Sequence, residues 1–221
     1  MSRRIGKTER AIREAIVEAC REMNAAGLNQ GTSGNVSARF RKRMLITPSA
    51  TPYAEMEPEM IAEMPIHGDR GAWRGPAKPS TEWRFHLDIL RARPEAGAVI
   101  HAHPPYATAL AMCRKGIPAA HYMVAAFGGA DVRCSDYATF GTAELSEAAL
   151  RALDGRAACL LANHGIIAVG PTLKKAMWLA VELETLARQY VISLGLGGPV
   201  ILGAGEIAET MRAFAGYGLK D

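Results

Sequence analysis

Hydrophobic positions along this 221-residue chain follow two periods, and each period predicts a different kind of element. Apolar residues three or four positions apart, as at Ile12, Ile16 and Met23, are typical of helices that bury one face. Glycine, proline and threonine mark where these helical patterns begin and end. We expect helices over residues 8–26, 104–115, 143–153, 172–194 and 205–215, and another between Pro79 and Pro94.

Shorter apolar runs that are bounded by turn residues predict strands, the first two of which form a hairpin. Strands and helices are mixed without the regular alternation of a parallel sheet. The pattern therefore predicts the α/β class, as a single domain over residues 1–221 in which helices cover a largely antiparallel or mixed sheet. We expect strands at 36–40, 44–47, 61–66, 98–103, 119–124, 131–134, 157–162 and 165–170.

Composition narrows the class of protein. Hydrophobic residues make up 49% and charged residues 22%, as in globular proteins, and no apolar stretch approaches the roughly 20 residues of a membrane span. The four cysteines are scattered without a C-x-x-C pair, and the basic start lacks the apolar core of a secretory signal, so we expect a cytoplasmic protein. The densest basic cluster, residues 39–43, fits a solvated hairpin turn better than a nucleic-acid site. The net charge of +4 suits an anionic small substrate, and we expect neither a membrane nor a nucleic-acid partner.

Histidines supply the most informative local pattern. The run that ends in His101-Ala102-His103 alternates as a strand does, so both imidazoles project from one face. A third histidine, His164, follows another apolar run and precedes Gly165. Three neutral imidazoles suit a catalytic zinc ion, which keeps a fourth position open. The sequence alone does not establish that His164 lies near the other two.

Glu82 is the carboxylate most easily associated with these histidines. It lies in the first turn of a predicted helix, where the macrodipole favours acids and where Ser80 or Thr81 would be the cap. Helix capping therefore explains Glu82 in isolation. His86 lies four residues further on the same helical face and is a rival ligand. We favour a supporting or packing role for it, because three histidines already fill a zinc site.

A polar, glycine-rich loop, Gly31-Thr32-Ser33-Gly34-Asn35, precedes the first predicted strand. Its backbone N–H groups, hydroxyls and amide can cradle a phosphate, although an ordinary turn has the same composition. Residues 47–51 and Ser80-Thr81 offer further neutral donors, which can hold a phosphate at a helix N-terminus without an arginine. The lysines lie in turns or on polar faces, so Schiff-base chemistry is not expected.

Taken together, eight segments resemble the class II aldolase/adducin family, most closely its bacterial members that act on L-fuculose 1-phosphate. The similarity runs from about residue 8 to the tyrosine near the C-terminus, so it covers nearly the whole chain. The combination is specific, although no single segment is. The matching segments are GLNQGTSGNVSARF, MLITPSATPY, PSTEWRFH, AVIHAHPPYATA, IPAAHYMVAAFGG, YATFGTAELSE, NHGIIAVG and MWLAVELETLARQY.

The resemblance implies a zinc ion held by His101, His103 and His164, with Mn²⁺, Co²⁺ or Fe²⁺ as possible substitutes. In this family the glutamate that matches Glu82 ligates the metal in the resting site. It serves as an acid/base group once the substrate displaces it.

Other positions match the substrate contacts of the family. Phe140 matches a residue that lines the aldehyde end, and Tyr122 matches a tyrosine that handles the aldehyde-side oxygen. Tyr217 matches a tail tyrosine that closes over the substrate. Ala50 departs from the glycine of the family, and its methyl group would shift the phosphate slightly. The phosphate site maps onto Gly34, Asn35, Ser49, Ser80 and Thr81.

The implied fold is a single three-layer α/β/α domain, assembled as a C4 homotetramer with sites between subunits. The implied activity is that of a zinc-dependent aldolase, which cleaves a ketose 1-phosphate reversibly to dihydroxyacetone phosphate and an aldehyde in carbohydrate metabolism or salvage. L-Fuculose 1-phosphate, 5-deoxyribulose 1-phosphate and 5-(methylthio)ribulose 1-phosphate are the candidate substrates. Three other interpretations stay open: a sugar-phosphate 4-epimerase, a phospho-keto-acid decarboxylase and a non-catalytic adducin-like binding module.

Overall fold

The computed structural model describes residues 5–214, and its helices follow the predicted periodicity. The first helix ends just before Gly27, whose φ of +71° is a backbone conformation that glycine adopts easily. The longest begins after Thr172, whose hydroxyl oxygen accepts a hydrogen bond from the N–H of Lys175 (3.1 Å), as the sequence predicted. The helices are α1 (Lys7–Ala25), α2 (Trp83–Ala92), α3 (Pro105–Met112), α4 (Ala143–Ala152), α5 (Leu173–Leu194) and α6 (Ala204–Phe214).

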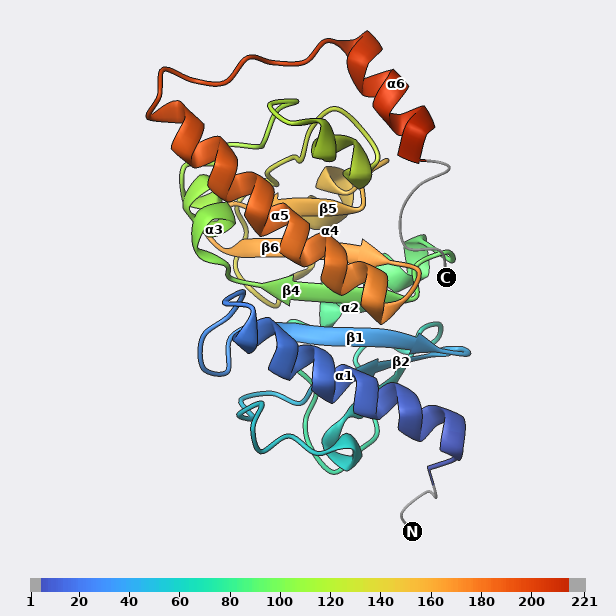
Figure 1. The fold of residues 1–221 in the computed structure, drawn as a ribbon. Coiled ribbons are helices and arrows are strands. Elements are labelled where there is room, and N and C mark those ends of the chain that lie inside the picture. The colour runs from blue at the N-terminus through green and yellow to red at the C-terminus, as the bar shows by residue number, and fades with distance from the viewer. Residues whose placement is uncertain (1–4, 215–221) are drawn as a thin grey trace.

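Six strands form one sheet in which every neighbouring pair is antiparallel. Its order is β3-β2-β1-β4-β6-β5. Helices α1 and α5 lie across one face, and α2 and α4 lie behind the sheet (Figure 1), so that a separate hydrophobic cluster fills each side. The three-layer α/β/α arrangement is therefore confirmed. The strands are β1 (Asn35–Phe40), β2 (Arg43–Ile46), β3 (Ala62–Pro65), β4 (Ala98–Ala102), β5 (Ala158–Leu161) and β6 (Gly165–Gly170).

The strand predicted at 119–124 is wrong. This segment leads instead into a 3₁₀ helix, η2 (Tyr122–Phe127), and the His121 ring caps it by accepting a hydrogen bond from the N–H two residues further on (3.2 Å). Val124 and Phe127 are both fully buried. The apolar residues that suggested a strand therefore reach the core from helical turns.

The strand predicted at 131–134 is also wrong. The segment makes two isolated bridges, one between Val132 and Ile117 and one between Cys134 and Leu160. Because its two bridges go to different neighbours, the ladder of consecutive pairs that defines a strand does not form.

Sheet register brings the polar ends of three strands together. Asn35 at the start of β1 pairs with His101 in β4, and Ala102 pairs with Ile166 near the start of β6.

Beyond α5, the chain returns along an extended segment to α6, which packs beside η2 (Figure 1). None of the described helices has the length and apolar character needed to cross a membrane.

Candidate metal centre and active site

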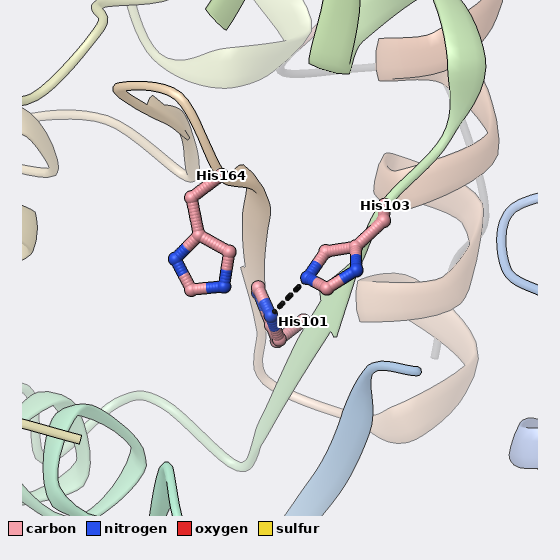
Figure 2. Close-up of side chains that lie close together, drawn as sticks. All are labelled: His101, His103 and His164. Atoms are coloured by element: carbon pink, nitrogen blue, oxygen red, sulfur yellow. Dashed lines mark hydrogen bonds between the residues drawn. The ribbon is translucent and has the colours of Figure 1, made fainter. Parts of the chain in front are cut away.

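Three histidine rings converge where β4 ends and β6 begins (Figure 2). His101 lies in β4, His103 follows that strand, and His164 lies in the turn between β5 and β6. One ring nitrogen from each histidine lies within 4.8 Å of the others. The proximity of His164 that the sequence left open follows from the antiparallel pairing of β4 with β6.

The backbone sets the orientation of the His101 ring. Its Nδ1 lies 2.9 Å from the carbonyl oxygen of Ile166, so Nδ1–H donates there and Nε2 faces the other histidines. The Nε2 atom of His103 lies 2.9 Å from the Nε2 atom of His101 (Figure 2). Burial lowers the pKa of His103 to about 4, so this ring is neutral at pH 7. Because His101 donates Nδ1–H to Ile166, its Nε2 lone pair is left to face His103, as in a histidine that ligates a metal.

Glu82 faces the histidines and does not cap a helix with its side chain. Helix α2 begins at Trp83, and Glu82 takes the N-cap position without a side-chain hydrogen bond to the helix. Its Oε2 lies 3.2 Å from His101 Nε2, and its Oε1 lies 3.2 Å from His164 Nε2. The capping interpretation of Glu82 is therefore wrong, because the carboxylate is turned away from the helical N–H groups.

The electrostatics of this cluster keep Glu82 ionised. Burial raises the pKa of the Glu82 carboxyl, but His101 and His164 outweigh burial and hold that pKa below its ordinary value. Its Oε1 is buried and, although it lies 3.2 Å from His164 Nε2, it makes no hydrogen bond with the described residues. A buried, unpartnered carboxylate oxygen beside three imidazoles is a ligand position in need of a cation, so this donor set fits a divalent metal such as zinc.

His86, the rival ligand, lies outside this cluster. Its ring is fully buried behind Asn35, whose side-chain amide donates a hydrogen bond to Glu82 Oε2 (2.9 Å). The His86 Nε2 atom bonds the Asn35 side-chain oxygen, and its Nδ1 atom bonds the Ser37 hydroxyl (2.8 Å). Burial lowers the pKa of His86 to about 3, so the ring is neutral. Its contacts agree with a supporting role and leave no nitrogen for a metal.

An open pocket of about 390 Å³ lies against the cluster. Glu82, His103 and His164 line it, whereas His101 is fully buried. The residues expected to bind the phosphate, and Phe140 from the aldehyde end, line this one pocket: Gly34, Asn35, Ser49, Ser80, Thr81 and Phe140.

The glycine-rich loop at residues 31–35 forms one wall of the pocket and offers neutral hydrogen-bond donors. Within the described chain, the residues that line the pocket include neither lysine nor arginine. Tyr53 is buried, and its hydroxyl donates to the carbonyl oxygens of Ser33 (2.7 Å) and Gly34 (2.9 Å), which holds the loop in place. Gly34 has a φ of +76°, and a Cβ atom there would lie 2.6 Å from the carbonyl oxygen of His101. Only glycine fits where the loop meets β4 so closely.

Sequence reasoning did not single out three residues that line the pocket, Tyr137, Ala138 and Asn163. Asn163 has a φ of +54°, which asparagine tolerates better than most residues, and its side chain donates to the Met112 carbonyl oxygen (3.3 Å). This turn immediately precedes His164, and its signal was the Asn-His-Gly sequence at a strand end. Tyr137 lies in an exposed loop that has no periodic pattern to mark it.

Ala50, the departure from the family pattern, lines the pocket with a φ of +53°. This conformation costs an L-residue about 1–2 kcal/mol, whereas glycine adopts it without strain. We expect Ala50→Gly to stabilise the fold by up to about 1 kcal/mol after the entropy of the unfolded chain is counted, which raises Tm by up to about 4 °C. Calorimetry measures the change.

Arg41→Gly is the matched control, because Arg41 has a φ of +57° in the turn between β1 and β2, outside the pocket. Both variants should raise Tm, and only Ala50→Gly should lower KM for a phosphorylated substrate. A lower Tm for Ala50→Gly would contradict the strain at this position.

The two candidate tyrosines lie apart from this pocket or outside the described residues. Tyr122 begins η2, is half-exposed and does not line the pocket; its ring packs in parallel with that of Phe214 in α6, with centroids 6.3 Å apart. Tyr217 lies outside the described residues. Within the described part of one chain, the histidines and Glu82 are therefore brought together without Tyr122.

The fold and the site together define a class: an antiparallel α/β/α protein with a histidine and carboxylate centre at the sheet edge. The sequence matches the family described as Class II Aldolase and Adducin N-terminal domain over residues 14–191. The chain belongs to the class II aldolase/adducin family.

Several characterised proteins are similar over nearly the full chain. The chain is 51% identical over 208 residues to the 5-methylthioribulose-1-phosphate/5-deoxyribulose-1-phosphate aldolase of Rhodospirillum rubrum, covering 94% of this chain and 93% of that protein. It is 45% identical over 206 residues to the L-fuculose phosphate aldolase of Escherichia coli K12, covering 93% and 94%. A solved structure of an L-fuculose 1-phosphate aldolase has a TM-score of 0.88 at 38% identity, covering 93% of this chain and 96% of that one.

Proposed function

We propose that this protein is a zinc-dependent aldolase that cleaves a ketose 1-phosphate reversibly to dihydroxyacetone phosphate and an aldehyde. The observation that carries the proposal is the cluster of His101, His103, His164 and Glu82 beside a pocket of neutral hydrogen-bond donors. The relatives named above are aldolases of such sugar phosphates, which supports the reaction class. The cytoplasmic location stays a prediction from the sequence.

Cleavage between C3 and C4 of the ketose leaves an electron pair on C3 and requires the C4 hydroxyl to lose its proton. A bound zinc ion would supply Lewis-acid stabilisation of that electron pair. Tyr122 would take the proton from the C4 hydroxyl and pass it to solvent. Glu82, once it has taken up a proton from solvent, would deliver that proton to C3, so the cleavage gains and loses no proton overall. Each acid/base group contributes about 10²–10⁴-fold to the rate. Asn35, Ser49, Ser80 and Thr81 would hold the phosphate and so fix the reacting end.

The aldehyde half is the finer question. The 51% identity to an aldolase of 5-methylthioribulose and 5-deoxyribulose 1-phosphates supports salvage of those sugars, and the 45% identity to an L-fuculose phosphate aldolase keeps that sugar as the second candidate. The test compares kcat/KM for the three ketose 1-phosphates at fixed zinc, following dihydroxyacetone phosphate. We expect the salvage substrates to lead by at least about tenfold, a span within what pocket shape can discriminate. A lead for L-fuculose 1-phosphate would reverse the assignment.

The same assay separates the other interpretations. An epimerase would convert the substrate without releasing free aldehyde, and a decarboxylase would release carbon dioxide from a phosphorylated keto acid. An adducin-like binding module needs no complete metal site, so zinc bound in a one-to-one ratio by the purified protein would disfavour it.

We further propose a C4 homotetramer in which each site is shared between neighbouring subunits. Tyr122 supports this, because its own chain places it outside the pocket that it would serve. Cyclic assembly brings one surface of each subunit against a different surface of the next. Such contact would deliver Tyr122 to the metal centre of a neighbour.

Co-expression tests the shared site. His103→Ala and Tyr122→Phe subunits should each be nearly inactive alone, because one lacks a ligand and the other lacks the proton acceptor. Random mixing should restore about a quarter of wild-type activity, since one contact in four then joins an intact metal centre to an intact tyrosine. Two affinity tags select the mixed oligomers. Mixed oligomers that stay inactive would show that the tyrosine acts within its own subunit.

A further inference from the structure

A buried chain of hydrogen bonds leads away from Glu82 into the protein. It runs from the Glu82 carboxylate to the Asn35 side chain, then to the His86 ring and finally to the Ser37 hydroxyl. All four residues are buried, and Ser37 and His86 have no exposed surface. The proposed reaction uses Glu82 and Asn35 but leaves His86 and Ser37 without a task.

The periods of a strand and a helix explain why these four residues meet. Asn35 and Ser37 are two apart in β1, so their side chains project from the same face of the sheet. Glu82 and His86 are four apart at the start of α2, so they share one helical face. Asn35 therefore lies between Glu82 and His86, and the His86 ring bridges Asn35 to Ser37.

The carboxylate determines the direction of every hydrogen bond in this chain. An ionised carboxylate only accepts, so Asn35 must present its NH₂ group to Glu82. The Asn35 carbonyl oxygen then faces His86, which must carry its proton on Nε2. The bare Nδ1 of the same ring must accept, so the Ser37 hydroxyl donates. The reverse direction would place the Asn35 oxygen against Glu82 Oε2, 2.9 Å from the amide group as it stands.

We propose that His86 and Ser37 are positioning residues that lock the Asn35 amide, and through it the Glu82 carboxylate, in the orientation that the reaction needs. This inference deepens the proposed function and rests on it for the role of Glu82. The second N–H of the Asn35 amide is then left for the pocket, which Asn35 also lines. One amide thereby holds the acid/base group and offers a donor to the substrate.

The Phe85 ring packs against His86 within this chain and against His101 in the histidine cluster. It stacks on His86 with centroids 4.7 Å apart and meets His101 edge-on at 5.3 Å. His86 has no exposed surface, and burial lowers its pKa to about 3, so its ring is neutral. The chain of hydrogen bonds from Glu82 to Ser37, called the relay below, requires a neutral His86 ring in one tautomer.

Nitrogen NMR of the full-length, metal-free protein tests the relay without reference to activity. Histidine labelled with ¹⁵N reports which ring nitrogen carries the proton, and His86→Gln assigns the signal among the six histidines. We expect His86 to be protonated at Nε2 and bare at Nδ1 across neutral pH. Protonation at Nδ1, or at both nitrogens, would overturn the proposal.

Kinetics of paired variants separates positioning from packing. A glutamine at position 86 can still donate to Asn35, whereas a leucine fills the space without a donor. We expect His86→Leu to lower kcat and zinc affinity by about 10–100-fold, as losses behind a metal ligand do, and His86→Gln to recover most of both. Ser37→Ala, which removes only a hydroxyl, should fall between them. Equal losses in the glutamine and leucine variants would reduce His86 to a packing residue.

Ser146→Ala is the matched control for Ser37→Ala. Ser146 is also buried, and its hydroxyl donates to Asp88, outside the chain of bonds to Glu82. We expect its kcat and zinc affinity to stay at the wild-type values. If the protein cleaves none of the ketose 1-phosphates, the proposed function fails, while the tautomer and the zinc affinities still decide the relay.

Discussion

His103→Ala is expected to remove bound metal and lyase activity together. The ring is neutral at pH 7, lies 2.9 Å from His101 through the two Nε2 atoms, and lines the pocket, so its loss takes away a ligand that faces the substrate. Lewis-acid stabilisation is worth several kcal/mol, and each 1.4 kcal/mol is tenfold in rate, so kcat should fall by about 10³-fold or more. Mass spectrometry of the dialysed protein measures the zinc, and dihydroxyacetone phosphate measures the activity.

His67→Ala controls for the loss of any histidine, because His67 is exposed in the turn after β3 and does not line the pocket. It should keep one zinc per chain and wild-type kcat. A His103→Ala protein that retains both zinc and activity would contradict the proposed metal centre. A protein that loses zinc but keeps its activity would separate the metal from the reaction.

Most helices and strands, and the pairing of His101 with His103, could be predicted from the sequence because they follow from local periodicity. The alternation that ends in His101 and His103 requires both rings on one face, and the structure places them so. His164 could not be placed, since its proximity depends on the neighbour that β6 selects in the sheet. Strand order is a property of the whole fold and leaves no mark on the residues around His164.

The errors arose where one local pattern serves two structures. Glu82 at a helix start has the composition of a cap, and only the fold turns its carboxylate toward His101 and His164. Residues 119–124 have the apolar content of a strand, yet they lead into a 3₁₀ helix that His121 caps and that buries its apolar side chains. The role proposed for Tyr122 would require a neighbouring subunit, and no local pattern in the sequence predicts such a contact.

Glu82→Gln is expected to abolish most of the activity while the metal stays bound. Glutamine keeps the size of the side chain and can still accept the hydrogen bond from Asn35, and three histidines remain to hold zinc. It cannot exchange a proton with C3, so kcat should fall by about 10²–10⁴-fold with little change in KM. Glu55→Gln, at an exposed position outside the pocket, should leave kcat unchanged.

Hydrogen exchange isolates the step assigned to Glu82 from the one assigned to Tyr122. Dihydroxyacetone phosphate alone, with enzyme in deuterated water, should exchange the hydrogen that corresponds to C3 of the ketose without any aldehyde present. Tyr122→Phe should retain this exchange, because no C4 hydroxyl is involved, and Glu82→Gln should lose it. Since His101 and His164 hold the pKa of Glu82 below its ordinary value, the carboxylate that removes this hydrogen is ionised throughout the neutral range. Exchange at the wild-type rate in Glu82→Gln would assign the proton transfer to another group.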